Sequence, residues 1–184
     1  ETMGTIYAIK YSETPLLTNQ LHQDITLIFN NINKEMSTYD TTSEISIFNN
    51  MPANLLYQIS PDFYYVLEKS NYYYNLSNGL FDITIEELSS IWGFNNESFA
   101  RPKDDEIKKT LEIIGFDKIQ LLGNNSISKI NNKVKISLNA IAKGYALDKI
   151  SNYFDANNIK DYMIEIGGEV RTKGRNSDGQ KWII

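Results

Sequence analysis

The sequence of 184 residues contains no cysteine. Disulfide bridges, thiolate metal sites and a cysteine nucleophile are therefore excluded. Histidine is almost as scarce, because His22 is the only one. A histidine-based catalytic triad or a multi-histidine zinc site is not expected from a single imidazole. His22 lies on the polar side of a helical pattern, and we predict that it is an ordinary surface residue.

Positive charge is also in short supply. Lysine and arginine number 18 against 23 aspartate and glutamate residues, which gives a net charge of −5. A surface that binds nucleic acid needs clustered basic residues, so no nucleic-acid partner is expected. A phosphate ligand would instead be held locally, by backbone N–H groups, one or two cations or a metal ion. No apolar run approaches the length of about 20 residues that spans a bilayer.

Helical and strand-like patterns follow one another without a strict βαβ rhythm. Helices are predicted at residues 15–36, 61–78, 104–114 and about 141–154, with a short capped turn at 42–46. Strands are predicted at residues 3–11, 81–85, 162–166 and 169–173, and two more lie around the turn at 123–125 within residues 119–135. This mixture predicts the α+β class, with mixed sheets and packed helices. At this length the chain is one domain or part of one larger domain.

Several element ends carry local signals. Ser60 is a candidate N-cap, and Pro61 suits the first turn of the helix that follows. Asn78-Gly79 is typical of the left-handed position that ends a helix. Asn176-Ser177-Asp178-Gly179 predicts a hairpin turn.

The stretch from Ile136 to Asp148 combines two periods. Val134, Ile136 and Leu138 alternate as in a half-buried strand, and the later apolar residues shift to helical spacing. The residues at the junction are small: Ala140, Ala142, Gly144 and Ala146. Small residues and a helix N-terminus allow an anion to approach the backbone, so phosphate binding is one interpretation. The other is close packing of the helix on a sheet, since no Walker or Rossmann spacing is present.

Five segments taken together resemble the ApbE family, the FAD:protein FMN transferases, and they follow the family's order along nearly the whole chain. The segments are Met3-Gly4-Thr5; Met36-Ser37-Thr38-Tyr39-Asp40 with Ser43-Glu44-Ile45-Ser46, Phe48 and Asn49; Gly79-Leu80-Phe81-Asp82-Ile83-Thr84 with Leu88 and Trp92-Gly93-Phe94; residues 139–148; and Glu165-Ile166-Gly167-Gly168-Glu169. The resemblance implies an extracytoplasmic, often lipid-anchored bacterial enzyme. Such an enzyme binds FAD and Mg²⁺, releases AMP and leaves FMN on a Ser or Thr of an acceptor flavoprotein.

The resemblance also implies site residues. Those matching FAD-contacting positions are Met3, Tyr39, Leu80, Phe81, Asp82, Asn139 and Tyr145, and Ala142 matches a backbone-carbonyl ligand of the metal. Tyr39 and Phe81 offer flat apolar faces for a ring, and Asp82 can accept hydrogen bonds from a ribose hydroxyl or an adenine amine. The alternative makes both aromatic residues part of the core and Asp82 a strand-end cap. Lys143 is either a point charge beside the phosphates or a solvated lysine.

Glu165 and Glu169 flank Gly167-Gly168 and have two interpretations, an acid/base pair or a structural role. Two departures from the family pattern stand out. Glu87 occupies a position where the family often has proline before Leu88. Family members also run well beyond this length, and their remaining part carries an aspartate and a threonine that complete the metal site. We therefore expect residues 1–184 to be the N-terminal portion of a larger domain, incompetent alone and partnered by the C-terminal portion of the same protein.

Two other functions remain open at this stage. A hydrolase would split FAD into FMN and AMP, with water replacing the acceptor hydroxyl. A flavin carrier would bind FAD without turnover.

Overall fold

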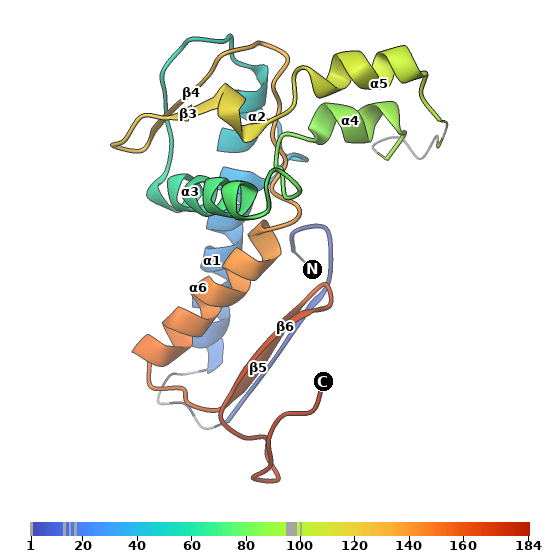
Figure 1. Ribbon diagram of the computed structural model, residues 1–184. Helices are drawn as coiled ribbons and strands as arrows, with labels where there is room; N and C mark the ends of the chain where they lie inside the picture. The colour runs from blue at the N-terminus through green and yellow to red at the C-terminus, as the bar shows by residue number, and fades with distance from the viewer. Residues whose placement is uncertain (1, 13, 15, 17, 95–98, 100) are drawn as a thin grey trace. The chain divides into compact units, whose positions relative to one another are not determined.

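The computed structural model describes residues 2–12, 14, 16, 18–94, 99 and 101–184. The chain divides into two compact units, one formed by Glu1–Asn33 with Ile141–Ile184 and the other by Lys34–Ala140. Both combine helices with small antiparallel sheets (Figure 1), so the α+β class is confirmed. Membership of one larger domain stays a prediction. None of the helices in the described part of the chain has the length and apolarity that crossing a bilayer requires.

The first unit contains a three-stranded antiparallel sheet in the order β1-β5-β6. Its strands are β1 (Tyr7–Tyr11), β5 (Tyr162–Ile166) and β6 (Glu169–Lys173), and its helices are most of α1 (Thr18–Met36) and α6 (Ala142–Ala156). The predicted strands at 162–166 and 169–173 are confirmed. The predicted helix at 15–36 is confirmed from Thr18, and its residues 15 and 17 lie outside the described part of the chain.

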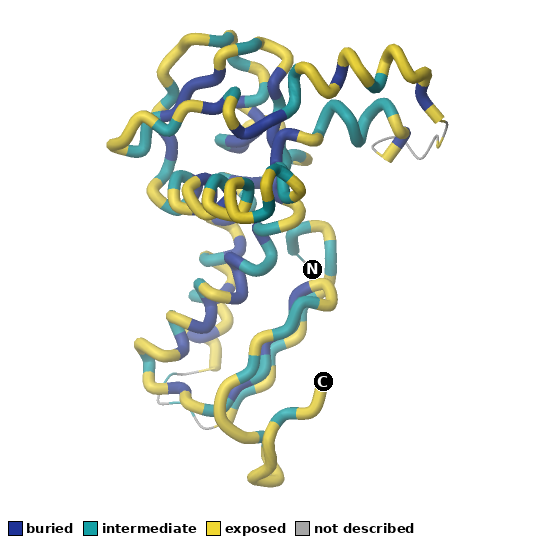
Figure 2. Tube along the Cα trace, in the orientation of Figure 1, coloured by how far each residue is buried: buried dark blue, intermediate teal, exposed yellow. Residues whose placement is uncertain are grey.

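The apolar residues on one side of α1 and on one side of α6 are buried, and so is every second residue of β5 (Figure 2). The members of this core are Leu21, Ile25, Phe29, Ile32, Ala146, Leu147, Ile150, Phe154, Tyr162, Ile164 and Ile166. The ring of Phe154 lies 5.1 Å from that of Tyr162, and the ring of Tyr7 lies 4.7 Å from that of Phe29. One face of the sheet therefore packs against the helices. His22 is exposed, as predicted.

The second unit contains α2 (Glu44–Asn50), α3 (Pro61–Leu76), α4 (Glu86–Ile91), α5 (Asp104–Leu111) and the 3₁₀ turn η1 (Phe116–Lys118). Its sheet is antiparallel, in the order β2-β4-β3, with strands β2 (Tyr57–Gln58), β3 (Ile119–Leu121) and β4 (Ser126–Lys129). The Ser60 hydroxyl accepts a hydrogen bond from the Phe63 N–H, which confirms the predicted N-cap. Asn78 and Gly79 have φ angles of 54° and 82° and end α3 as predicted.

Three predicted strands were wrong in whole or in part. Residues 3–6 form no strand, because Thr2 and Thr5 exchange two backbone hydrogen bonds of 2.9 Å around a turn with positive φ at Met3 and Gly4. Residues 81–85 form turns before α4, not a strand. Residues 134–138 alternate in burial as predicted but join no strand ladder. Their backbone groups bond instead to side chains and to two loop carbonyls, those of Asn131 and Ile83.

Candidate functional site

Tyr39 lies on an exposed turn after α1. Its side chain is 83% exposed, which rules out the core interpretation for this residue. The next residue, Asp40, accepts hydrogen bonds at Oδ1 from the N–H (2.8 Å) and the hydroxyl (2.7 Å) of Thr42. The hydrogen bond from the Thr42 hydroxyl, and to a lesser extent the one from the Thr42 N–H, holds the pKa of Asp40 below its usual value. The Ser43 hydroxyl ties the turn to the Ser37 carbonyl at 2.7 Å, so the backbone that carries the Tyr39 ring is fixed although the ring is free.

Phe81 and Asp82 occupy a second turn of the same kind. Asp82 Oδ1 accepts hydrogen bonds from the N–H (2.8 Å) and the hydroxyl (2.7 Å) of Thr84, and that hydroxyl accepts one from the Gly115 N–H at 2.7 Å. The Phe81 ring is half-buried and lies 6.0 Å from the ring of Tyr73. Within the described part of the chain, Asp82 Oδ2 accepts no hydrogen bond. One carboxylate oxygen therefore caps the turn, and the other remains for a ligand.

The two turns repeat one pattern, an aromatic residue followed by Asp, any residue and Thr. An aspartate that bonds to the backbone two residues later forms an Asx turn. Thr42 and Thr84 were not among the predicted site residues, although the repeated spacing in the sequence was a signal that could have found them. Leu80, beside the second turn, is 92% exposed, so its side chain is available for contact.

Asn139 is exposed and follows the extended segment 134–138. The Ser137 N–H donates to the Ile83 carbonyl at 2.8 Å. Ile83 follows Asp82 directly, and Asn139 lies two residues beyond Ser137. This bond therefore brings together two predicted FAD-contacting segments that are far apart in the sequence.

In the first unit, Met3 is half-buried on its turn. The Gly167 N–H donates to the Ile6 carbonyl at 3.1 Å, and a Cβ at Gly167 would lie 2.9 Å from the Thr5 side chain. The turn after β5 thus packs against the segment that follows Met3, and only glycine leaves the room for it.

Ala142, Lys143 and Tyr145 lie in the first turn of α6. Ala142 is 6% exposed and Tyr145 is 8% exposed, so neither offers a ligand much side-chain surface. Lys143 is 3.5 Å from the carboxylate of Glu169 on β6. Lys143 is therefore ion-paired in this structure, and its role as a point charge beside the phosphates stays a prediction. A Cβ at Gly144 would lie 3.4 Å from the same carboxylate, so the small residues at this junction do allow close packing.

Glu165 and Glu169 do not form an acid/base pair. In the β5–β6 hairpin, Glu165 pairs with Val170 and Ile166 pairs with Glu169. Because successive residues of a strand point to opposite faces, Glu165 and Glu169 lie on opposite faces of the sheet. Glu169 faces α6 and pairs with Lys143, whereas Glu165 lies on the other side.

A Mg²⁺ site is not completed by the residues that the structure describes. Mg²⁺ prefers hard oxygen ligands, usually with carboxylate help. No group of three or more His, Asp or Glu side chains able to hold a metal is found among the described residues. The carbonyl of Ala142, the predicted ligand, does not form a site by itself, so these residues alone do not fit the ion.

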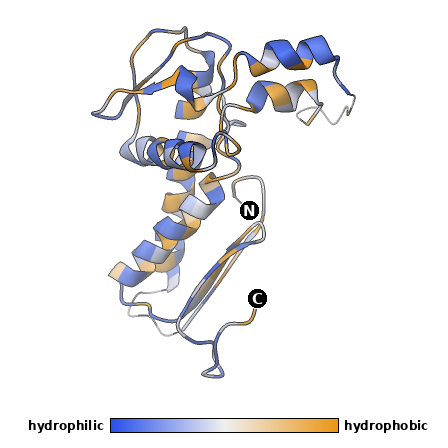
Figure 3. Cartoon of the chain, viewed as in Figure 1, coloured by the Kyte–Doolittle hydropathy of each residue, from blue (hydrophilic) through white to orange (hydrophobic). Residues whose placement is uncertain are grey.

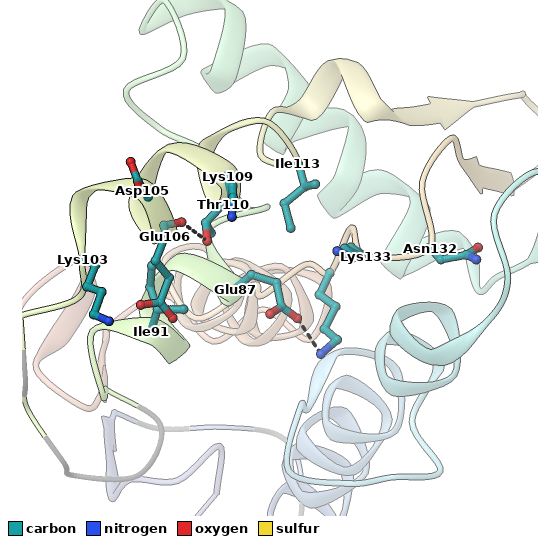
Figure 4. A pocket seen from close by; sticks show the side chains of 11 residues that line it. Glu87, Ile91, Lys103, Asp105, Glu106, Lys109, Thr110, Ile113, Asn132 and Lys133 are labelled. Carbon is teal, nitrogen blue, oxygen red and sulfur yellow. Dashed lines mark hydrogen bonds and ion pairs between the residues drawn. The ribbon is translucent and has the colours of Figure 1, made fainter.

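A cavity of about 640 Å³ lies within the second unit, between α4, α5 and the segment after β4 (Figure 4). Hydrophilic residues dominate α5 (Figure 3), and nine of the eleven residues that line the cavity are charged or polar. Glu87 and Lys135 form an ion pair of 2.6 Å in its wall, which gives the departure at Glu87 a structural role. No predicted FAD-contacting residue lines this cavity.

Residues 3–184 match the sequence model of the ApbE family. The chain is 35% identical to the FAD:protein FMN transferase of Haemophilus influenzae and 34% identical to that of Vibrio cholerae. Both alignments cover 100% of this chain and 56% of the relative. The chain thus spans little more than half the length of these curated relatives.

Solved structures agree with the sequence comparison. The flavin transferase ApbE from Vibrio cholerae superimposes with a TM-score of 0.92 at 34% identity, covering 100% of this chain and 60% of that one. The apo form of the flavinyl transferase ApbE from Pseudomonas stutzeri also gives 0.92, at 28% identity and with the same coverage. The α+β fold of this chain is therefore the fold found in those proteins.

Proposed function

The chain belongs to the ApbE family, and on that basis we propose that its protein is an FAD:protein FMN transferase. The enzyme moves FMN from FAD to a Ser or Thr hydroxyl of an acceptor flavoprotein and releases AMP. The observation that carries this proposal is identity of 35% and 34%, over the whole chain, to relatives named for that activity.

The reaction replaces the phosphoanhydride bond of FAD by a phosphate ester. The acceptor oxygen forms a bond to the phosphorus of the FMN half, and the bond from that phosphorus to the bridging oxygen breaks. AMP leaves with the bridging oxygen, and the acceptor hydroxyl gives up its proton. No residue of this chain is assigned to that proton.

The residues of this chain bind and orient FAD in the proposal. The exposed ring of Tyr39 and the half-buried ring of Phe81 offer faces for stacking. Asp82 Oδ2 accepts a hydrogen bond from a ribose hydroxyl or an adenine amine, while Oδ1 stays with Thr84. Met3, Leu80, Asn139 and Tyr145 complete the proposed contacts.

We also propose a requirement for Mg²⁺, with the Ala142 carbonyl as one ligand. Such an ion would neutralise charge on the pyrophosphate. The remaining ligands would come from outside the described residues, which supply no carboxylate cluster for it. The proposed partners are the acceptor flavoprotein and the C-terminal portion of the same protein. The proposed location is extracytoplasmic, with a lipid anchor, as the family resemblance implies.

The test uses the whole protein with FAD and Mg²⁺, with and without a candidate acceptor subunit, followed by mass spectrometry. The expected result is AMP together with an FMN-sized adduct on the acceptor. FMN and AMP without an adduct, at the same rate with or without acceptor, would indicate a hydrolase. Bound FAD without any AMP would indicate a carrier.

A further inference from the structure

The side chain of Asn49, at the end of α2, forms a reciprocal pair with the backbone of Ile136. Its Nδ2 donates to the Ile136 carbonyl at 2.9 Å, and its Oδ1 accepts from the Ile136 N–H at 2.8 Å. A side-chain amide can do this because it presents a donor and an acceptor side by side. Asn49 therefore takes the place that a neighbouring strand would have in a ladder.

A buried lysine strengthens the same junction. Lys129 on β4 is 0% exposed, and its ammonium donates to the backbone carbonyls of Asn49 at 2.9 Å and Val134 at 3.0 Å. One cation thus joins the end of α2 to the beginning of the extended segment. A buried charge needs such partners to be tolerated.

The other side of the segment is held by the bond from the Ser137 N–H to the Ile83 carbonyl. Asn49 and Ile83 together fix residues 136 and 137, and the exposed Asn139 follows with no bond of its own to α2 in the described structure. The position of Asn139 relative to Asp82 therefore depends on the amide of Asn49 together with the Ser137–Ile83 bond.

We propose that Asn49 is a positioning residue for FAD, which acts through Asn139. This inference rests on the proposed function, because Asn139 is a proposed FAD contact. Asn49 itself need not touch the ligand. Loss of its amide frees the segment that carries Asn139, so part of the Asn139 contact is lost with it.

A double-mutant cycle on FAD affinity tests the proposal in the whole protein, with flavin fluorescence as the readout. Asn49→Ala is expected to weaken FAD binding about tenfold, which corresponds to the loss of roughly one hydrogen bond between Asn139 and FAD. In an Asn139→Ala background, Asn49→Ala should cost little more, because coupled residues are not additive. Combined with Tyr39→Ala, whose turn has its own bonds, Asn49→Ala should cost its full tenfold. A general loss of structure would give additive effects in both cycles.

Asn50→Ala is the matched control. Asn50 is the exposed neighbour, and its amide donates to Ser46 within α2, so FAD affinity should not change. If Asn49→Ala does not fold, judged by circular dichroism, Asn49→Asp replaces it. Aspartate keeps the acceptor for the Ile136 N–H and loses the donor.

The outcomes separate this inference from the proposed function. Wild-type protein that binds no FAD would overturn both. If the wild-type protein binds FAD, two results would overturn the inference alone. One is additive effects of Asn49→Ala and Asn139→Ala on FAD affinity, and the other is normal FAD affinity in either single variant.

Discussion

The hydroxyl of Tyr153 on α6 donates a 2.6 Å hydrogen bond to the carboxylate of Asp24 on α1. The bond crosses between two helices of the first unit whose residues are distant in the sequence. Burial, followed by the bond to Asp24 and its charge, raises the pKa of Tyr153 to about 12.

Tyr153→Phe should lower the free energy of unfolding by about 1.5–3 kcal/mol, the range for a hydrogen bond to a charged group. The full difference in stability between wild type and variant should be present below pH 10, the unperturbed pKa of tyrosine. It should disappear as the pH rises toward 12, because the folded protein then loses the Tyr153 proton as well. Urea unfolding of both proteins at pH 8 and pH 11 measures it. Tyr72→Phe, at a tyrosine that is 60% exposed, should have little effect at either pH. A loss from Tyr153→Phe that stays constant with pH would contradict the assignment.

Lys129 should make stability rise with pH. Burial, followed by repulsion from Lys135, lowers the pKa of Lys129 from 10.5 to about 8. Between these values the unfolded chain binds more protons than the folded one, so stability rises with pH, by up to about 1.4 kcal/mol per pH unit.

Lys129→Met removes this rise. Chemical denaturation of wild type and variant from pH 7 to 9.5 should show the stability difference growing in favour of wild type. The exposed Lys133 provides the control, since Lys133→Met should leave the slope unchanged. Parallel pH profiles for Lys129→Met and wild type would show that Lys129 does not titrate in this range.

Asp82→Asn separates the turn from the ligand. The variant keeps an oxygen for the Thr84 bonds but replaces the free carboxylate oxygen by a donor. We expect an unchanged free energy of unfolding and FAD binding weaker by about 1–3 kcal/mol, measured by titration. Asp40→Asn, in the matching turn beside Tyr39, should leave FAD affinity intact. Equal FAD affinity in wild type and Asp82→Asn would remove Asp82 from the site.

Gly167 and Gly168 form a natural pair for comparison, with φ angles of 56° and 89°. An alanine at either pays a left-handed penalty of about 1–2 kcal/mol. At Gly167 the new Cβ would also meet the Thr5 side chain at 2.9 Å, whereas at Gly168 it meets nothing within 4 Å. Gly167→Ala should therefore destabilise the protein by about 1 kcal/mol more than Gly168→Ala does, as measured by thermal unfolding. Equal effects would mean that Thr5 moves aside.

Much of the fold follows from local sequence. Ser60 and Pro61 begin α3, and Asn78-Gly79 ends it, because capping and left-handed backbone depend on residues within one turn. The family resemblance likewise identified Tyr39, Phe81 and Asp82 as candidates. The sequence shows Asp40 and Asp82 at the same spacing from a threonine. Only the structure shows that each aspartate bonds to that threonine, Thr42 or Thr84, and so stabilises its turn.

The sequence by itself therefore determined α1, α3, α5 and α6, the two ends of α3, the residue ranges of β5 and β6, and the family to which the chain belongs. It did not predict that α4 is a helix or that β5 and β6 pair as a hairpin. Tertiary structure alone decided the rest. The alternation of Val134, Ile136 and Leu138 specifies which side is buried, but a ladder needs a partner strand, and here Asn49, Lys129 and Ile83 supply the partners instead. Glu165 and Glu169 were separated to opposite faces by a pairing register that a two-glycine turn sets. Such outcomes depend on groups far apart in the chain, because a backbone hydrogen bond is satisfied by whichever partner folding brings within reach.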